Sequence, residues 1–349
     1  MDEFARRPAE DRRAYIDEAA ARRDLTPIII EKDFWVCWTL RRLVMCPDLA
    51  GHMTFKGGTS LSKAYGIIAR FSEDIDLTIS RSAPLLDKVA SPMEEKIGTN
   101  ERKRRTDALK PAAQAYVENV AMPILAREIE AALGTADGWS LALDPDDKDQ
   151  QTLLFVYPRT SGYGLAYGEN YGGADESGYI KPRIKLEFGA RGDTEPFELR
   201  PISSYLAEDF PEELPDASTE VPTLAVARTF WEKVTILHAI HHNGKLREGM
   251  SRHYYDVLML DQAGVTAEAL ARIELLEQVV HNKSLMFADK SASYETAVVG
   301  TLRLSPDGAN RERLERDYSA MADMFMAAPP EFDALMEGLA SIERTINAH

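Results

Sequence analysis

Cysteine and long apolar runs are the features that this sequence has least of. Only Cys37 and Cys46 occur among 349 residues, and one helix through both would hold them about 13 Å apart. That is too far for a disulfide, so we expect two small core residues in a reducing compartment. No run of eighteen apolar residues occurs, and the first seven residues lack a signal-peptide stretch. We therefore expect a cytoplasmic protein that does not enter the membrane.

Positive charge is also scarce. The chain has 41 Lys and Arg residues against 57 Asp and Glu residues, which gives a formal net charge of −16. Such a surface repels nucleic acid at long range, which argues against a general nucleic-acid coating protein but leaves room for a local basic groove. The excess of carboxylates also suits a protein that gathers them around a divalent cation.

The length suggests two domains, each able to bury a core without disulfides. Periodicity predicts an α+β domain over residues 1–215 and a helical domain over residues 216–349. Helices are expected over residues 8–24, 27–46 and 59–65. A further helix is expected to follow the polar segment 82–110 and to end at about residue 133. Strands are expected over residues 53–56, 76–79, 153–157, 183–188 and 197–202.

The first candidate site is a pair of acidic residues, Asp74 and Asp76. On a strand, residues two apart point to the same face, so both carboxylates would lie side by side. Two adjacent carboxylates repel each other unless a cation lies between them. Mg²⁺ suits this position because it takes oxygen ligands and shares them with substrate phosphates. Two solvated acids at a strand end would explain an isolated Asp-x-Asp equally well.

The residues upstream favour the metal interpretation. Gly57-Gly58 follows the strand candidate at 53–56, and a helix with Thr59 or Ser60 as its cap is expected next. Glycines let the backbone approach a phosphate, and a helix start offers free N–H groups to an anion. Arg70 lies in the connector to the carboxylates. A tight turn would explain the glycines alone, but it explains the whole arrangement poorly.

Two-metal phosphoryl transfer usually needs a third carboxylate, and Glu187 is our choice. It lies in an alternating strand, with Lys185 and Arg183 on the same face. Such a charged row is either a solvated face or the floor of an active site. Asp193 and Glu198 are weaker rivals for the same role.

These residues resemble a known family. The stretch Phe55–Lys63, followed by Arg70-Phe71-Ser72-Glu73-Asp74-Ile75-Asp76-Leu77, is similar to the first motif of the AbiEii/AbiGii nucleotidyltransferase-like toxins of type IV toxin–antitoxin and abortive-infection systems, which include the MenT toxins. The resemblance covers roughly residues 25–345. Its further segments are Glu31–Trp35, Glu232-Lys233, Arg252–Asp256 and Asp317–Met321.

The resemblance implies a polymerase-β-type nucleotidyltransferase fold, with a mixed sheet flanked by helices and a C-terminal helical domain that completes the nucleotide site. It implies that Asp74, Asp76 and Glu187 bind Mg²⁺ or Mn²⁺. It places a nucleoside triphosphate (NTP) against one group of residues: Gly57, Gly58, Thr59, Ser60, Arg70, Ser72 and Lys233. It also implies that Asp256 completes the catalytic set, either by orienting Lys233 or by contacting the nucleotide.

The expected function is therefore transfer of a nucleoside monophosphate from an NTP to an acceptor such as a tRNA 3′ end or another RNA, under the control of a cognate antitoxin. Two alternatives stay open. One is nucleotidyl transfer to a small molecule or a protein. The other is a nucleotide-binding partner protein without catalysis, since binding alone would also need Asp74 and Asp76.

Three other patterns are expected to be structural. His238, His241 and His242 could offer a helix face to zinc, but no cysteine and no His-Glu-x-x-His pattern accompanies them. The basic run 102–105 could meet RNA phosphates but is more typical of a solvated face. Tyr163, Tyr167 and Tyr171 could stack on bases, or could pack against one another within a loop.

Overall fold

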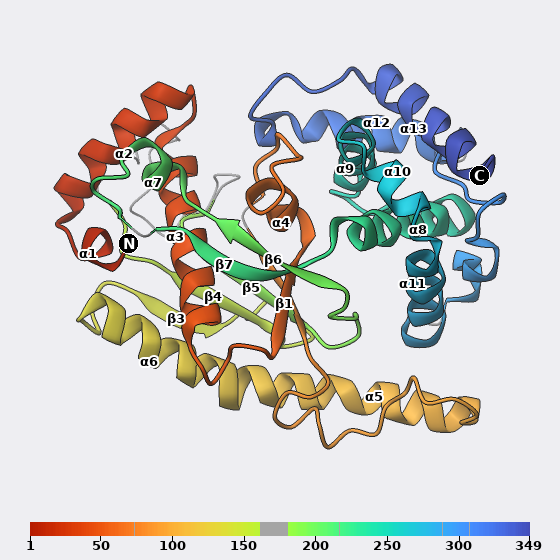
Figure 1. Cartoon of the computed structure of the whole chain (residues 1–349), viewed down its shortest axis with the longest axis horizontal. Coiled ribbons are helices and arrows are strands. Elements are labelled where there is room, and N and C mark those ends of the chain that lie inside the picture. Colours follow the sequence, from red (N-terminus) through yellow and green to blue (C-terminus); the bar gives the residue numbers. More distant parts are fainter. Residues whose placement is uncertain (73, 161–180, 216, 288, 307) are drawn as a thin grey trace.

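A seven-stranded mixed sheet forms the centre of the computed structural model, which confirms the expected α+β class (Figure 1). The structure describes residues 1–72, 74–160, 181–215, 217–287, 289–306 and 308–349. The strand order is β3-β4-β5-β2-β1-β7-β6. The strands are β1 Met53–Lys56, β2 Ile75–Ile79, β3 Ser140–Leu143, β4 Thr152–Val156, β5 Ile184–Gly189, β6 Phe197–Ile202 and β7 Thr219–Leu224.

Strand β2 lies in the middle of the sheet. It pairs antiparallel with β1 and parallel with β5, and β1 also pairs parallel with β7. The outer pairs β3–β4, β4–β5 and β6–β7 are antiparallel. Segments far apart in the sequence are therefore neighbours at the centre of the sheet.

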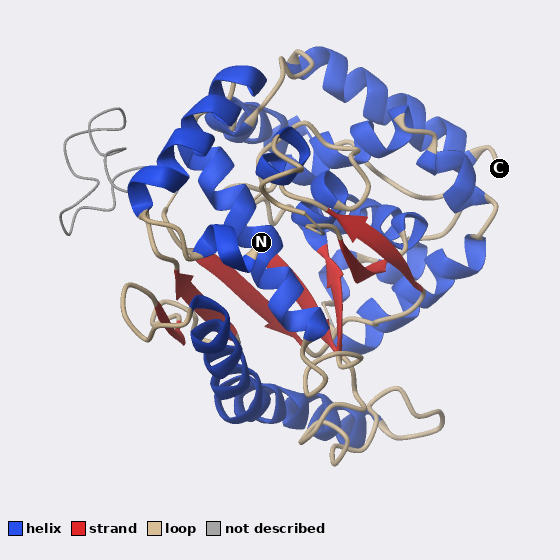
Figure 2. Cartoon of the chain, turned by 60° about the vertical axis from the view of Figure 1, so that its left-hand side comes forward, coloured by secondary structure: helices blue, strands red, loops and turns tan. Residues whose placement is uncertain are grey.

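The first half of the chain supplies the helices that cover the sheet (Figures 1 and 2). Helix α3 is apolar on nearly all sides and is buried along most of its length, as expected for a core helix. Its Trp35 stacks on Tyr157, with ring centroids 5.4 Å apart, beside β4. The helices are α1 Asp2–Ala5, α2 Ala9–Arg23, α3 Pro27–Met45, α4 Gly57–Lys63, α5 Thr99–Tyr116, a π-helical turn Val117–Ala121, α6 Met122–Leu133 and α7 Tyr205–Asp209. We call this part, with the sheet, the sheet lobe.

The second half forms a helical lobe with its own hydrophobic core, which also takes in Leu61 and Ile68 from the region of α4. None of the described helices is long and apolar enough to cross a membrane. The helices of this lobe are α8 Val226–Asn243, α9 Ser251–Gln262, α10 Val265–Leu270, α11 Ile273–Met286, α12 Gly308–Ala320 and α13 Phe332–Asn347. Three short 3₁₀ turns join them: Lys290–Ala292, Tyr294–Thr296 and Ala322–Met324.

Several local expectations are confirmed, among them the helices over 8–24 and 27–46 and the strand over 53–56. Both cysteines are buried and free. Two helix starts were wrong: α4 begins at Gly57 rather than at Thr59 or Ser60, and α5 already begins at Thr99. Strands β3 and β7 were missed. The division into domains at 215–216 stays a prediction, and the sheet continues past it to Leu224.

A buried ion pair fixes α4 to the core. Lys63 Nζ lies 2.7 Å from Asp33 Oδ1, and both side chains are almost fully buried. The second oxygen of Asp33 accepts a hydrogen bond from the Tyr205 backbone N–H at the start of α7. Burial lowers the pKa of Lys63, but the carboxylate of Asp33 outweighs this effect and holds the pKa above its ordinary value. The pair thus joins α3, α4 and α7.

We expect Asp33→Ala to lower the free energy of unfolding by about 3–5 kcal/mol, because Lys63 would stay buried without a counter-charge. Urea unfolding at neutral pH, followed by circular dichroism, measures the loss. The matched control is Glu18→Ala, which removes the exposed pair with Arg22 and should change stability by less than about 0.5 kcal/mol. Equal effects of the two substitutions would contradict the prediction.

Candidate active site

The two faces of the central strands differ in character. Ile75, Leu77 and Ile79 of β2 pack into the core, as do Ile184, Leu186 and Phe188 of β5. The alternating positions, among them Asp76, Lys185 and Glu187, therefore lie on the opposite face. Asp74 precedes β2 by one residue and shares that face with Asp76 by the same alternation. One face of the sheet is apolar core, and the other carries the charged candidates.

The register brings three charged residues side by side. Asp76 is paired with Lys56 of β1 on one side and with Glu187 of β5 on the other. Burial raises the pKa of Asp76 to about 6, and repulsion from Glu187 adds to the increase, while Lys56 opposes it. A carboxylate in this environment gains from any cation that binds beside it.

Gly57 makes close approach to Asp76 possible. Its φ is +79°, and a Cβ atom built on it would lie 1.9 Å from Asp76 Oδ2. A Cβ on Gly58 would lie 2.6 Å from both Arg70 Nη2 and Ser72 Oγ. Neither position has room for a side chain. The glycine pair therefore keeps the backbone against the carboxylate and against the residues of the connector.

The hydroxyls of Thr59 and Ser60 stabilise this loop internally. Thr59 Oγ1 donates to the backbone carbonyl of Asp74 at 2.5 Å and lies 3.0 Å from Ser72 Oγ. Ser60 Oγ donates to the carbonyl of Gly57 at 2.9 Å. Both residues are fully buried. Their contacts show them fixing the position of Asp74 and the glycine pair.

A buried charge cluster links the connector to the helical lobe. Asp256 of α9 accepts two hydrogen bonds from Arg70, at 2.8 Å from Nε and 2.9 Å from Nη2, and one from Lys233 of α8 at 2.8 Å. Asp256 is fully buried. Burial would raise the pKa of Asp256, but Arg70 and Lys233 hold it well below its ordinary range. The Asp256 carboxylate therefore holds Lys233 Nζ in place, and the catalytic role of either residue stays a prediction.

Glu187, the expected third acid, is already paired with a lysine. Its carboxylate is partly exposed and lies 2.7 Å from Lys185 Nζ. Within the described residues, no three His, Cys, Asp or Glu side chains are close enough together to hold a metal ion. The rivals are engaged or remote: Asp193 binds Arg228 at 2.6 Å, and Glu198 lies on the edge strand β6.

The patterns set aside in the sequence have structural partners. His238 Nε2 lies 3.1 Å from the Ser293 carbonyl, and Nδ1 accepts from the Arg303 N–H. In α5, Arg104 binds Glu101 and Lys103 binds Asp107, so the basic run is largely paired within its helix. Tyr163, Tyr167, Tyr171 and Glu73 lie outside the described residues.

Sequence reasoning missed two features. Lys56 stands next to the glycine pair and faces Asp76, which its position before Gly57 could have suggested. The Asp33–Lys63 pair could not be read from spacing, although Asp33 lies in the segment Glu31–Trp35 that carried part of the resemblance.

Comparison with known proteins finds one family model. A family model described as "Nucleotidyl transferase AbiEii toxin, Type IV TA system" matches residues 38–338. Among solved structures, the chain is similar to MenT4, the nucleotidyltransferase toxin Rv2826c from Mycobacterium tuberculosis H37Rv, at 15% identity and a TM-score of 0.42. That match covers 96% of this chain and 97% of the other. No curated protein matches.

We expect Asp256→Asn to lower the free energy of unfolding by about 3–5 kcal/mol, since Arg70 and Lys233 would remain buried without a carboxylate. Chemical unfolding at pH 7 tests this. Asp289→Asn is the matched control, because its pair with Lys245 is partly exposed and the substitution should change the unfolding midpoint much less. If the two variants unfolded at the same denaturant concentration, the proposed importance of the buried cluster would be wrong.

Proposed function

Because the chain belongs to the AbiEii family of nucleotidyltransferase toxins, we propose that it transfers a nucleoside monophosphate from an NTP to an acceptor, with Mg²⁺ or Mn²⁺ as the metal and the 3′ end of a tRNA or another RNA as the acceptor. The observation that carries the proposal is the position of Asp76. It lies between Lys56 and Glu187 in the register, with the Gly57 backbone against its carboxylate.

Asp74 and Asp76 fit a divalent cation. They share one face of the sheet, and the pKa of Asp76 is raised by burial and by repulsion from Glu187, both of which a bound cation would offset. Mg²⁺ needs only one or two protein carboxylates, since it keeps water and takes substrate phosphate oxygens as further ligands. When bound, the metal would neutralise negative charge on the phosphates of the NTP. Glu187 would complete the set on the acceptor side after release from Lys185.

The loop beside Asp76 would hold the triphosphate. Gly57 packs its backbone against Asp76, and Gly58 packs against Arg70 and Ser72, so the loop lies directly beside these polar groups. Lys233 would add positive charge from the helical lobe at a fixed place, because Asp256 already orients it. Thr59 and Ser60 would contribute by holding the loop. The NTP would thus bind between the lobes, which is the role proposed for residues 216–349.

The reaction is a displacement at phosphorus. A hydroxyl oxygen of the acceptor forms a bond to the α-phosphorus, the bond from that phosphorus to the bridging oxygen breaks, and pyrophosphate leaves. The hydroxyl proton passes to solvent. Lys233 and Arg70 stabilise the negative charge that develops on the departing phosphates.

A toxin of this family also needs restraint, and we propose a cognate antitoxin protein as its partner. A neighbouring gene for a DNA-binding winged-helix protein would support that partner.

The first test is incubation with each labelled NTP, Mg²⁺ and total RNA. The native protein should label RNA, and Asp74→Ala and Asp76→Ala should each lower the rate about a hundredfold or more, since each removes a carboxylate for the metal. Glu18→Ala serves as the folded control and should keep full activity. Label on a protein or on a small molecule would identify that molecule, rather than RNA, as the acceptor. Tight NTP binding without any product would refute the enzymatic proposal.

The second test uses two glycines with the same backbone conformation. Gly57 and Gly51 have φ values of +79° and +80°, but a Cβ on Gly51 meets nothing within 4 Å. Gly57→Ala and Gly51→Ala should each lower stability by about 1–2 kcal/mol through backbone strain. Only Gly57→Ala should also lower nucleotidyl transfer by about tenfold or more, because it displaces Asp76. Thermal unfolding and initial rates measure the two effects, and equal losses of activity would contradict the role of Gly57.

A further inference from the structure

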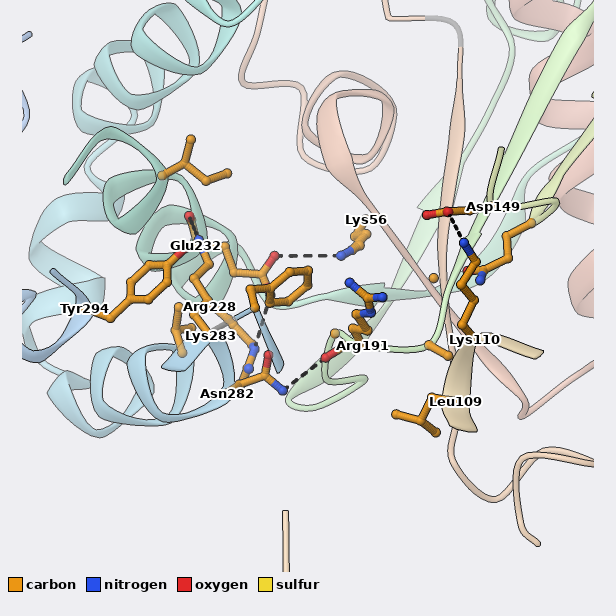
Figure 3. A pocket seen from close by; sticks show the side chains of 17 residues that line it. Lys56, Leu109, Lys110, Asp149, Arg191, Arg228, Glu232, Asn282, Lys283 and Tyr294 are labelled. Atoms are coloured by element: carbon orange, nitrogen blue, oxygen red, sulfur yellow. Dashed lines mark hydrogen bonds and ion pairs between the residues drawn. The ribbon is translucent and has the colours of Figure 1, made fainter. Parts of the chain in front are cut away.

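A cavity of about 420 Å³ opens between the sheet lobe and the helical lobe, and none of the proposed roles uses it (Figure 3). We call it the interlobe pocket. Strand β1 contributes Lys56, the turn after β5 contributes Arg191, α5 contributes Lys110, α8 contributes Arg228 and Glu232, and α11 contributes Lys283.

The interlobe pocket adjoins the proposed metal site. Lys56 lines it and is the register partner of Asp76, and Gly189 lines it two residues after Glu187, on the same face of β5. A Cβ built on Gly192 would lie 3.3 Å from Lys56 Nζ, so the turn after β5 closes against Lys56. Lys233, in contrast, is turned to the buried cluster around Asp256. The pocket therefore adjoins Asp76 through Lys56 and through the end of β5, and none of the residues proposed to hold the triphosphate lines it.

The charge of the pocket is opposite to that of the whole chain. Five cationic side chains line it against two carboxylates, Asp149 and Glu232, in a chain of net charge −16. Lys110 is paired with Asp149 at 2.5 Å, and Arg228 with Asp193 at 2.6 Å.

Among the described residues, the other three cations are paired more weakly. Lys56 Nζ lies 4.0 Å from Glu232, and Lys283 Nζ donates to a backbone carbonyl, that of Glu232, at 2.8 Å. Arg191 lies over the ring of Phe287, 5.8 Å from its centroid. Burial lowers the pKa of Lys283 to about 7, although the Glu232 carboxylate opposes this effect, and repulsion from Lys56 adds to it. Cations held together in a cavity in this way are stabilised by a bound anion.

The remaining residues that line the pocket suit the base of a nucleotide. The rings of Phe287 and Tyr294 and the apolar side chain of Ile236 give surfaces on which a base can stack or pack. The volume lies within the usual range of about 300–1,000 Å³ for small-molecule sites. A phosphate beside the three cations and a base against the rings would fill both parts of the pocket.

We propose that the interlobe pocket binds the acceptor strand of RNA, with a backbone phosphate between Lys56, Arg191 and Lys283 and a terminal base against Phe287. This assignment rests on the proposed nucleotidyl transfer. It places the attacking hydroxyl beside Asp76, at the end of β5, and leaves the NTP at the proposed triphosphate loop.

The test measures RNA binding directly, so that it does not depend on turnover. Fluorescence anisotropy with a labelled single-stranded RNA of twelve nucleotides compares the native protein with the double variant Arg191→Gln, Lys283→Gln. The affinity should fall by about tenfold or more, and the slope of log K against log salt should decrease by about 0.7, since both side chains contact the same phosphate. The KM for the NTP should change less than about twofold.

The matched control is Lys103→Gln, Arg104→Gln, which removes the same charge from exposed positions of α5. Thermal unfolding verifies that both double variants are folded. Equal loss of RNA affinity in the two would overturn the assignment, as would an unchanged affinity in the pocket variant. A rise in the KM for the NTP with unchanged RNA binding would assign the pocket to the NTP instead. A mononucleotide that binds as tightly as the RNA would also overturn it.

A failure of the proposed function gives a different pattern. In that case the native protein forms no labelled product, while the anisotropy measurement still reports whether the pocket binds RNA.

Discussion

The buried contact of Asp256 with Arg70 and Lys233 fixes how the two lobes meet. Arg70 comes from the connector before β2, Lys233 from α8 and Asp256 from α9. A carboxylate this deeply buried is strongly destabilising unless its cations are present, so the lobes pack in the arrangement that supplies them. The position of Lys233 relative to Asp76 then follows from the fold. The helical lobe also holds the connector through its backbone, since the Phe71 N–H donates to the Met324 carbonyl at 2.6 Å.

Local features of the sequence predicted most elements of the sheet lobe. The alternation around Asp76 and Glu187 identified β2 and β5, and the proline at the first position of α3 identified its start. The start of α4 was mistaken because glycine usually interrupts a helix. Here Gly57 begins α4 with a left-handed φ, and its missing side chain leaves room for Asp76. The expectation that glycine interrupts a helix failed here because Asp76, which is distant in the sequence, determines the conformation of Gly57.

The contacts between distant segments were not predictable from spacing. Pairing of Asp76 with Lys56 and Glu187 depends on the sheet order, which places β5 beside β2 although more than a hundred residues separate them. The Asp33–Lys63 pair likewise depends on how α3 crosses the sheet. The family resemblance suggested Lys233 and Asp256 as partners of the site, but the binding of Arg70 to the same carboxylate became visible only in the fold.

The net charge of −16 and a polyanionic substrate are compatible because electrostatic range is short in salt. At physiological ionic strength, charges separated by more than about 8 Å are largely screened. The charge that a nucleotide meets at the site is therefore set by the side chains around the interlobe pocket and the triphosphate loop. Inside a cavity the screening is weaker still, so Lys56 and Lys283 act more strongly than exposed cations would. For the proposed RNA acceptor, the acidic surface would weaken nonspecific contact elsewhere on the protein.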